Sequence, residues 1–229
     1  MTNNEIIAGT LSVFKECSIN NFPIDCWDII NQYGYKVKRY SELKPKKQEA
    51  CMGLSDDANI IGDTVYYNES KSTNRIRFSL MHELGHVILK SDNESECDKF
   101  ASHIIAPRIA IHYSKCKNAI DVTKIFILSD QASRIAFDDY RRWRRIISIY
   151  GMSAIDKQMY EHFYNEDAQK FVWTFDRCDF CYTNDTYNGD VLCDSCKLYE
   201  IRKNIHTRRT DYQEHDLDIA RSRWLYGNL

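Results

Sequence analysis

The sequence lacks an excess of either charge. Its 31 Lys and Arg residues face 33 Asp and Glu residues, which gives a formal net charge of −2. A global basic excess would point to nucleic acid, and an acidic excess would point to disorder. The whole-chain charge favours neither class, so any argument from charge must be local.

A long apolar run and a secretory signal are also missing. No segment approaches the ~20 apolar residues that a bilayer span needs. The acidic residue Glu5 precedes the first apolar residues, and no small-residue cleavage site follows them. The chain shows no internal repeat and no low-complexity segment. We therefore expect a cytoplasmic protein without a membrane partner.

The length and the apolar pattern predict one main domain with a small appendage. The chain has 229 residues, of which 43% are hydrophobic. Apolar residues at helical intervals predict helices at 5–18, 24–33, 74–89, 94–107 and 119–149. Short β-rich runs at 35–40, 51–54 and 63–68 predict a mostly antiparallel sheet. The expected fold class is α+β: a mostly helical core with a small antiparallel sheet, followed by a small C-terminal module.

The stretch RIRFSLMHELGHVILK carries the first chemical signal. His82 and His86 are four residues apart, so both imidazoles lie on one helical face and can reach a single metal ion. Glu83 lies beside them and can reach a water bound to that ion. The alternative is an ordinary helix with two surface histidines. A third ligand would favour the metal site.

A carboxylate follows at a suitable distance. The segment ESECDKFA begins eight residues after His86, behind a short turn that can fold a second helix back onto the first. Glu94 is favoured as the third ligand because Asp98, one helical turn later, can accept the outer N–H of a ligating histidine. Glu96 is the alternative ligand. Both glutamates could instead be a solvated first turn that complements the helix dipole.

Together the two segments resemble the ImmA/IrrE family of zinc metallo-endopeptidases. The resemblance covers about residues 20–145. Cys97 replaces the family's usual alanine, and Ile104-Ile105 replace its paired leucines. The residues that match the family pattern are Arg77, Phe78, Ser79, His82, Glu83, Gly85, His86, Glu94, Asp98, Phe100, Ala101 and Pro107.

The resemblance implies a zincin-like, gluzincin-type core over residues 1–150, with a helix-turn-helix-like segment at 119–148. It implies a catalytic zinc held by His82, His86 and Glu94. Such a zinc lowers the pKa of its water towards ~7, while Glu83 takes the water's proton and later passes it to the departing amine. It further implies a protein substrate, a helix-turn-helix repressor of a mobile element or prophage.

Two features of this expected site stay open in the sequence. The oxyanion needs a donor besides zinc, and several side chains could supply one. The run VYYN at residues 65–68 could be an edge strand that pairs with an extended peptide. The candidate oxyanion donors are Tyr66, Tyr67, His103, His112 and Tyr113.

Four of the nine cysteines form a second constellation. Cys178, Cys181, Cys193 and Cys196 follow the pattern CxxC…CxxC, in which two knuckles surround one ion with four thiolates. We expect a zinc ribbon at 171–200 with a structural zinc, after a linker at 151–170 and before a charged helical tail at 201–229. Asn188-Gly189 should form a turn. The alternative is disulfides or free thiols.

The residues around and outside this module have less specific interpretations. Aromatic side chains near the four cysteines could cover so small a module. The other cysteines lack ligand spacing, so we interpret them as small buried hydrophobic residues. The aromatic residues are Phe171, Trp173, Phe175 and Tyr182, and the remaining cysteines are Cys17, Cys26, Cys51, Cys97 and Cys116.

Two local basic clusters, at 141–145 and 202–209, could contact phosphates. Acidic residues flank both clusters, so solvated faces are favoured over a DNA site. DNA is therefore a less favoured partner than a protein substrate. The alternative functions are a DNA-binding regulator that uses the ribbon and the basic helix, and an antirepressor that binds without cleavage.

Overall fold

The computed structural model describes residues 1–203, and the chain divides after Thr174 into two compact units. Most of the predicted tail at 201–229 and of the second basic cluster lies outside the described residues. Residues 201–203, which are described, continue a helix over 194–203. Within the described part of the chain, no helix combines the length and apolarity that crossing a membrane requires.

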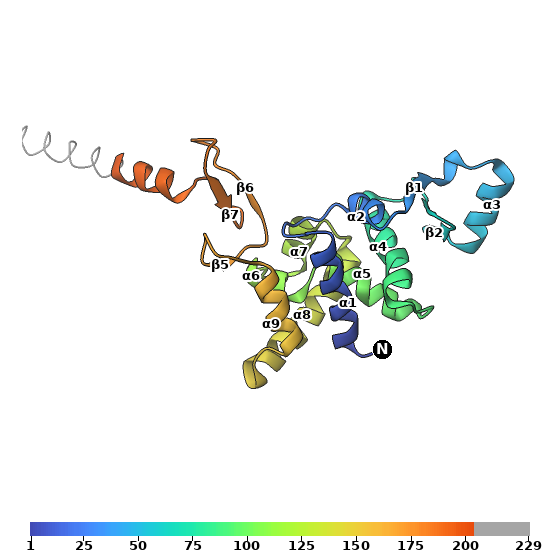
Figure 1. Ribbon diagram of the computed structural model, residues 1–229, viewed down its shortest axis with the longest axis horizontal. Coiled ribbons are helices and arrows are strands. Elements are labelled where there is room, and N and C mark those ends of the chain that lie inside the picture. Colours follow the sequence, from blue (N-terminus) through green and yellow to red (C-terminus); the bar gives the residue numbers. More distant parts are fainter. Residues whose placement is uncertain (204–229) are drawn as a thin grey trace, which may run out of the picture. The chain divides into compact units, whose positions relative to one another are not determined.

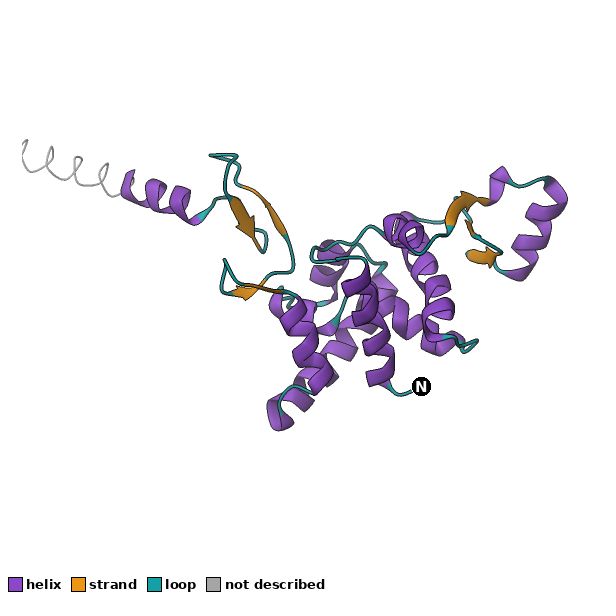
Figure 2. Ribbon diagram, in the orientation of Figure 1, coloured by secondary structure: helices purple, strands orange, loops and turns teal. Residues whose placement is uncertain are grey.

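Helices make up most of the first unit (Figures 1 and 2). Polar side chains cap the starts of several of them. Ser72 caps α4 and Asn93 caps α5, each through a side-chain oxygen that accepts backbone N–H groups. The helices are α1 (Asn3–Glu16), α2 (Cys26–Gln32), α3 (Pro45–Leu54), α4 (Thr73–Leu89), α5 (Glu94–Ile105), α6 (Arg108–Tyr113), α7 (Ala119–Phe126), α8 (Asp130–Tyr150) and α9 (Ala154–His162). The prediction of a mostly helical core is confirmed.

A three-stranded sheet precedes α4 in the chain. It contains β1 (Lys36–Arg39), β2 (Ala58–Ile61) and β3 (Thr64–Tyr67) in the order β1-β3-β2. The expected antiparallel pairing holds for β2 and β3, whereas β1 pairs with β3 in parallel. β3 contains most of the VYYN run and is central, because strands flank it on both sides. The expected edge strand is therefore wrong, and β2 is an edge.

The short run at 51–54 is not a strand. It forms the last turn of α3, which begins with Pro45 at its first position. Four residues with three apolar side chains carry too little periodicity to separate a strand from the end of a helix. Cys51 is 2% exposed, which agrees with its interpretation as a buried apolar residue.

α4 and α5 form an antiparallel hairpin at the centre of the first unit (Figure 1). Leu80, Met81 and Leu84 from α4 are fully buried, as are Phe100 and Ile104 from α5. The close approach depends on Gly85. A Cβ at this position would lie 3.2 Å from the Phe100 ring and 3.3 Å from the Cα of Cys97. The glycine of HELGH thus allows α5 to approach α4 closely at His82 and His86.

The buried Arg77 connects this hairpin to neighbouring segments. Its guanidinium donates hydrogen bonds to the carbonyl of Ile24 at 2.8 Å and to the carbonyl of Phe126 at 3.4 Å. These carbonyls lie just before α2 and at the end of α7. The buried guanidinium therefore links α4 to the main chain at Ile24 and at Phe126.

The predicted linker at 151–170 differs from the structure. α9 lies within this range, and its residue Met159 is buried in the main core, as is Phe163, which follows the helix. β4 (Tyr164–Asn165) then pairs with β5 (Lys170–Phe171). The first unit therefore extends to Thr174, because apolar contacts distant in sequence hold these residues.

The second unit contains an antiparallel hairpin and a helix. β6 (Phe175–Arg177) pairs with β7 (Asp185–Tyr187), and the helix over 194–203 follows. Asn188 and Gly189 both have positive φ, 61° and 82°, and the N–H of Asp190 donates to the carbonyl of Tyr187. The predicted turn is therefore confirmed.

Candidate metal centres

Two imidazole nitrogens converge on the α4 face that turns towards α5. The Nε2 atoms of His82 and His86 lie 3.2 Å apart. The Nδ1 atom of His82 lies 2.8 Å from Asp98 Oδ1, and the Nδ1 atom of His86 lies 2.8 Å from the carbonyl oxygen of Ser91. A carbonyl and a carboxylate can only accept, so both Nδ1 atoms carry the proton. In the neutral form of the rings, both Nε2 atoms therefore present lone pairs to the same point.

Glu94 completes this group from the first position of α5. Its Oε2 lies 2.9 Å from His82 Nε2, and its Oε1 lies 3.8 Å from His86 Nε2. The three donor atoms lie within 4.8 Å of one another. Two lone pairs and a carboxylate repel one another unless a cation sits between them. Two imidazoles and one carboxylate form a donor set that suits zinc and leaves a fourth position open.

Of the two glutamates weighed as third ligand, Glu94 is the one brought to the histidines. Glu96 accepts a hydrogen bond from the Ser91 hydroxyl at 2.6 Å and pairs with the amino group of Met1. These contacts hold Glu96 away from the histidine pair. Glu94 and Glu96, two residues apart in the first turn of α5, thus contact different partners.

Asp98 acts on the site through His82. Burial lowers the pKa of His82, but the hydrogen bond and the negative charge of Asp98 outweigh this effect, so its pKa is raised overall. A carboxylate in this position orients a ligating ring and makes its other nitrogen a stronger donor. Asp98 therefore contacts the outer nitrogen of His82, and metal binding by Glu94 stays a prediction.

Glu83 belongs to α4, and its side chain contacts the edge strand β2. Its Oε2 accepts a hydrogen bond of 3.2 Å from the backbone N–H of Ile60. Burial raises the pKa of Glu83, whereas positive charge on the neighbouring histidines opposes the rise. A carboxyl group with a raised pKa, held at one oxygen and facing a cavity, is suited to taking up and releasing a proton.

A cavity of about 470 Å³ lies in front of these groups. Its wall includes Arg75 and Asp57, which form a two-point ion pair with N–O distances of 3.0 and 2.5 Å. Arg75 lies seven residues before His82, two turns away on the same helical face, and this spacing could have revealed it. Asp57 carries no comparable signal because it lies on a separate segment of the chain.

None of the five candidate oxyanion donors lines this cavity among the described residues. His103 is buried beside Asn3, His112 contacts the rings of Tyr140 and Trp143, and Tyr113 stacks on Phe171. Tyr66 and Tyr67 lie on the central strand β3. The sequence therefore did not identify the oxyanion donor, because the residues that line the cavity come from other segments.

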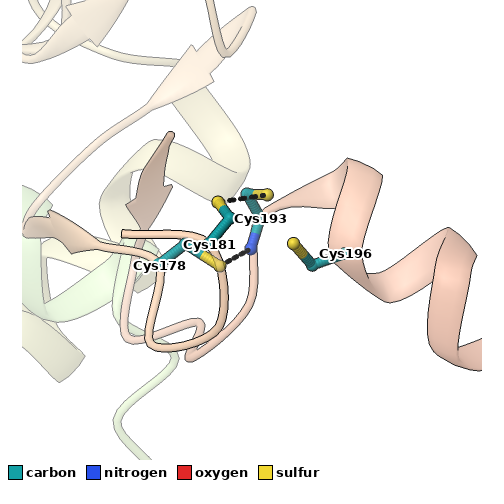
Figure 3. A group of neighbouring side chains, drawn as sticks. All are labelled: Cys178, Cys181, Cys193 and Cys196. Atoms are coloured by element: carbon teal, nitrogen blue, oxygen red, sulfur yellow. Dashed lines mark hydrogen bonds between the residues drawn. The ribbon is translucent and has the colours of Figure 1, made fainter. Parts of the chain in front are cut away.

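The four predicted cysteine ligands come together in the second unit (Figure 3). All are free thiols, and the Sγ atoms of Cys181 and Cys193 lie 3.8 Å apart. Two sulfurs bound at about 2.3 Å to one tetrahedral zinc would lie about 3.8 Å apart. The spacing therefore fits a metal and excludes a disulfide between this pair in the structure.

Hydrogen bonds in the first knuckle favour thiolates. The backbone N–H of Cys181, followed by those of Cys193 and Phe180, lowers the pKa of Cys178. Hydrogen bonds from Thr183 and from the backbone of Asn184 lower the pKa of Cys181 to about 5. Thiolates are the form that binds zinc.

The expected aromatic cover of this site is wrong. Phe171 and Trp173 pack in the core of the first unit, while Phe175 and Tyr182 are 41% and 75% exposed. Apart from the cysteines, Leu192 is the apolar residue that packs in the centre of the described part of the second unit. The four sulfurs therefore form most of its interior.

Residues 42–145 match the family described as the IrrE N-terminal-like domain, a peptidase family. The matched range contains β2, β3, α4 and α5, and with them every residue of the histidine site. It ends before the four cysteines. No curated protein and no solved structure matches the chain.

Proposed function

Because residues 42–145 belong to the family of IrrE N-terminal-like domains, we propose that the chain is a zinc-dependent endopeptidase. The observation that carries the proposal is the convergence of His82 Nε2, His86 Nε2 and a Glu94 oxygen, with Glu83 beside them. A buried carboxyl group next to a three-donor metal site is the arrangement that metal-assisted peptide hydrolysis requires.

His82, His86 and Glu94 would hold the zinc, which would supply a Lewis acid for the scissile carbonyl and lower the pKa of water. Glu83 accepts the proton of the attacking water and then donates it to the departing amine. The N–H of Ile60 fixes one oxygen of Glu83, so the other oxygen is directed to the proton transfer. Asp98 and the carbonyl of Ser91 keep both imidazoles in the metal-binding tautomer.

The substrate peptide would lie along β2. This strand has β3 on one side, and its N–H at Ile60 points away from β3 towards Glu83. An extended peptide can add to such an edge through main-chain hydrogen bonds. Arg75, which also lines the cavity, offers a guanidinium that its pairing with Asp57 keeps in place.

The substrate that we propose is an intracellular helix-turn-helix repressor of a mobile element or prophage, as the family resemblance implies. The four cysteines would hold a second zinc. With four protein ligands this ion has no open position, so its role would be structural. The second unit would then be a docking module for the substrate.

The test is to incubate the purified full chain, loaded with zinc, with a repressor encoded beside it. The parent should cut the repressor, whereas Glu83→Gln should reduce the rate by about 10²–10⁴-fold because the amide cannot accept the proton. Glu96→Gln is the matched control and should cut at the parental rate. Equal cutting by the parent and Glu83→Gln, or no cutting by the parent with zinc bound, would refute the proposal.

A further inference from the structure

A second large cavity, of about 970 Å³, shares no lining residue with the catalytic cavity. It lies between the segment after α6 and the C-terminal half of α8. Its cationic side chains are exposed, and we call this surface the basic groove. The cations are Lys115, Lys117, Arg141, Arg144 and Arg145.

The base of the basic groove is aromatic. The His112 ring lies 6.1 Å from the Tyr140 ring and 5.8 Å from the Trp143 ring, and Phe137 packs beside Tyr140 at 5.6 Å. Burial and the charge of Arg144 lower the pKa of His112, so this histidine is neutral at pH 7. The positive charge of the groove therefore comes from its lysines and arginines.

These cations have little anionic compensation. Arg141 lies 3.9 Å from Asp138, and both side chains are about two-thirds exposed, so this pair is weak. Within residues 1–203, no carboxylate forms an ion pair with Lys115, Lys117, Arg144 or Arg145. Like charges on adjacent turns of one helix repel each other. A concave surface with such a charge fits an anionic ligand.

Two observations favour a protein over a nucleic acid as this ligand. The formal net charge is −2, so a long phosphate chain would gain no attraction from the rest of the protein. On the last turns of the same helix, Ile146, Ile149 and Tyr150 are 56%, 73% and 82% exposed. Exposed apolar side chains beside a charged groove are typical of a protein-binding surface.

α8 also connects the basic groove to the catalytic region. Its residues Gln131 and Ile135 line a third cavity, of about 410 Å³, which shares Arg75, Phe78 and Asp98 with the catalytic cavity. From Ile135 to Arg144 the helix rises by about 14 Å. A protein held at the active site can therefore reach the basic groove along one helix.

We propose that the basic groove is a docking site for an acidic segment of the protein substrate, with apolar side chains among its Asp and Glu residues. The inference rests on the proposed peptidase function, because it assigns the segment to the molecule that is cut. Docking at the groove would raise the affinity for the substrate, while the peptide bond is positioned at β2.

Binding is measured by fluorescence anisotropy with the full-length Glu83→Gln variant. The probe is a labelled twelve-residue peptide with six glutamates and two phenylalanines, and the matched peptide has glutamine at each glutamate. The acidic peptide should bind at least tenfold more tightly than the glutamine peptide. Its affinity should fall between 50 and 200 mM salt, because salt screens exposed charges.

The variant Arg141→Glu/Arg144→Glu should bind the acidic peptide at least tenfold more weakly. Arg141→Gln/Arg144→Gln should fall between this variant and the parent. Arg134→Glu is the matched control, since Arg134 is exposed on α8 outside the groove, and it should bind within twofold of the parent. Thermal melting of each variant checks that the fold is kept.

Equal binding of the two peptides, or parental affinity in the double Glu variant, would overturn the docking proposal. It would also be overturned if a twelve-nucleotide DNA displaced the peptide, bound more tightly than it and lost affinity in the same variant. That result would assign the groove to nucleic acid. Binding by Glu83→Gln does not depend on hydrolysis, so failure of the groove and failure of the peptidase remain distinguishable.

Discussion

The two candidate metal centres differ in what holds their ligands in place. Around the histidine site, Asp98 and Ser91 orient the rings, and a buried apolar core lies beneath them. Around the cysteine site, the sulfurs themselves occupy most of the interior. The first site is thus organised by the surrounding fold, whereas we expect the fold of the second unit to depend on its site.

This difference also concerns access. The histidine site faces a cavity that the Glu83 carboxyl group also lines, so its geometry is suited to proton transfer during a reaction. The cysteine site offers four sulfurs and no carboxylate among its described ligands. We therefore expect a metal to have opposite consequences in the two units: reactivity in the first and folding in the second.

The largest effect is expected from Cys178→Ser. Structural zinc contributes about 10–16 kcal/mol to the folding of small zinc modules, so loss of one ligand should unfold the second unit. The first unit should keep its structure. Hydrogen exchange resolved by residue would show lost protection beyond residue 175 and unchanged protection in α4 and α5. Loss of protection in both units would contradict the expectation that only the second unit depends on the cysteine site for its fold.

The next largest effect is expected from His82→Ala. The parent should contain two zinc ions per chain, and this variant should contain one and show no peptidase activity. Because the core beneath the site is apolar, its secondary structure should persist. Metal analysis and circular dichroism together check the prediction. Unfolding of the first unit would mean that its fold also depends on metal.

A smaller effect is expected from Asp98→Asn. The amide keeps the shape but removes the charge that raises the pKa of His82. Zinc affinity at the histidine site should fall by about 10–100-fold. Competition with a chelator measures this affinity, with the cysteine site as the internal reference. Parental affinity in Asp98→Asn would show that the contact does not tune the metal.

The smallest effect is expected at the edge of the catalytic cavity. The hydrogen bond from Arg75 lowers the pKa of Asp57, so the pair stabilises the fold above the unfolded-state pKa of about 3.9. This contribution is lost as the pH falls through the folded-state pKa. Asp57→Asn should cost less than about 1 kcal/mol at pH 7, because the pair is partly exposed. Urea unfolding at pH 7 and below pH 4 checks this prediction, and a larger difference below pH 4 would contradict it.

Features that depend on neighbouring residues could be predicted from the sequence. The helix containing His82 and His86, the turn after it and Glu94 lie within a short segment, and local periodicity and capping place them. The turn at Asn188-Gly189 follows from the same local chemistry. The four cysteines were likewise identified by spacing alone.

Features that depend on distant packing could not be predicted in this way. The order of the strands makes β2 the edge, and nothing in its four residues indicates this position. Phe171 was expected beside the cysteines, but its ring stacks on Tyr113, which is distant in the sequence. Asp57 reaches the cavity only because the segment before β2 meets α4.

Ser91, in the turn between α4 and α5, fixes the alignment of the two helices at the histidine site. Its carbonyl accepts a hydrogen bond from His86, and its hydroxyl donates one to Glu96. This turn residue therefore orients one candidate metal ligand and holds the Glu96 carboxylate away from the site. Adding or removing one residue between Lys90 and Asn93 would change the length of this turn and shift the start of α5 relative to α4. Glu94 would then leave the histidines. In a redesigned chain this turn acts as a fixed-length spacer: its sequence can vary only where these two hydrogen bonds and its length are preserved.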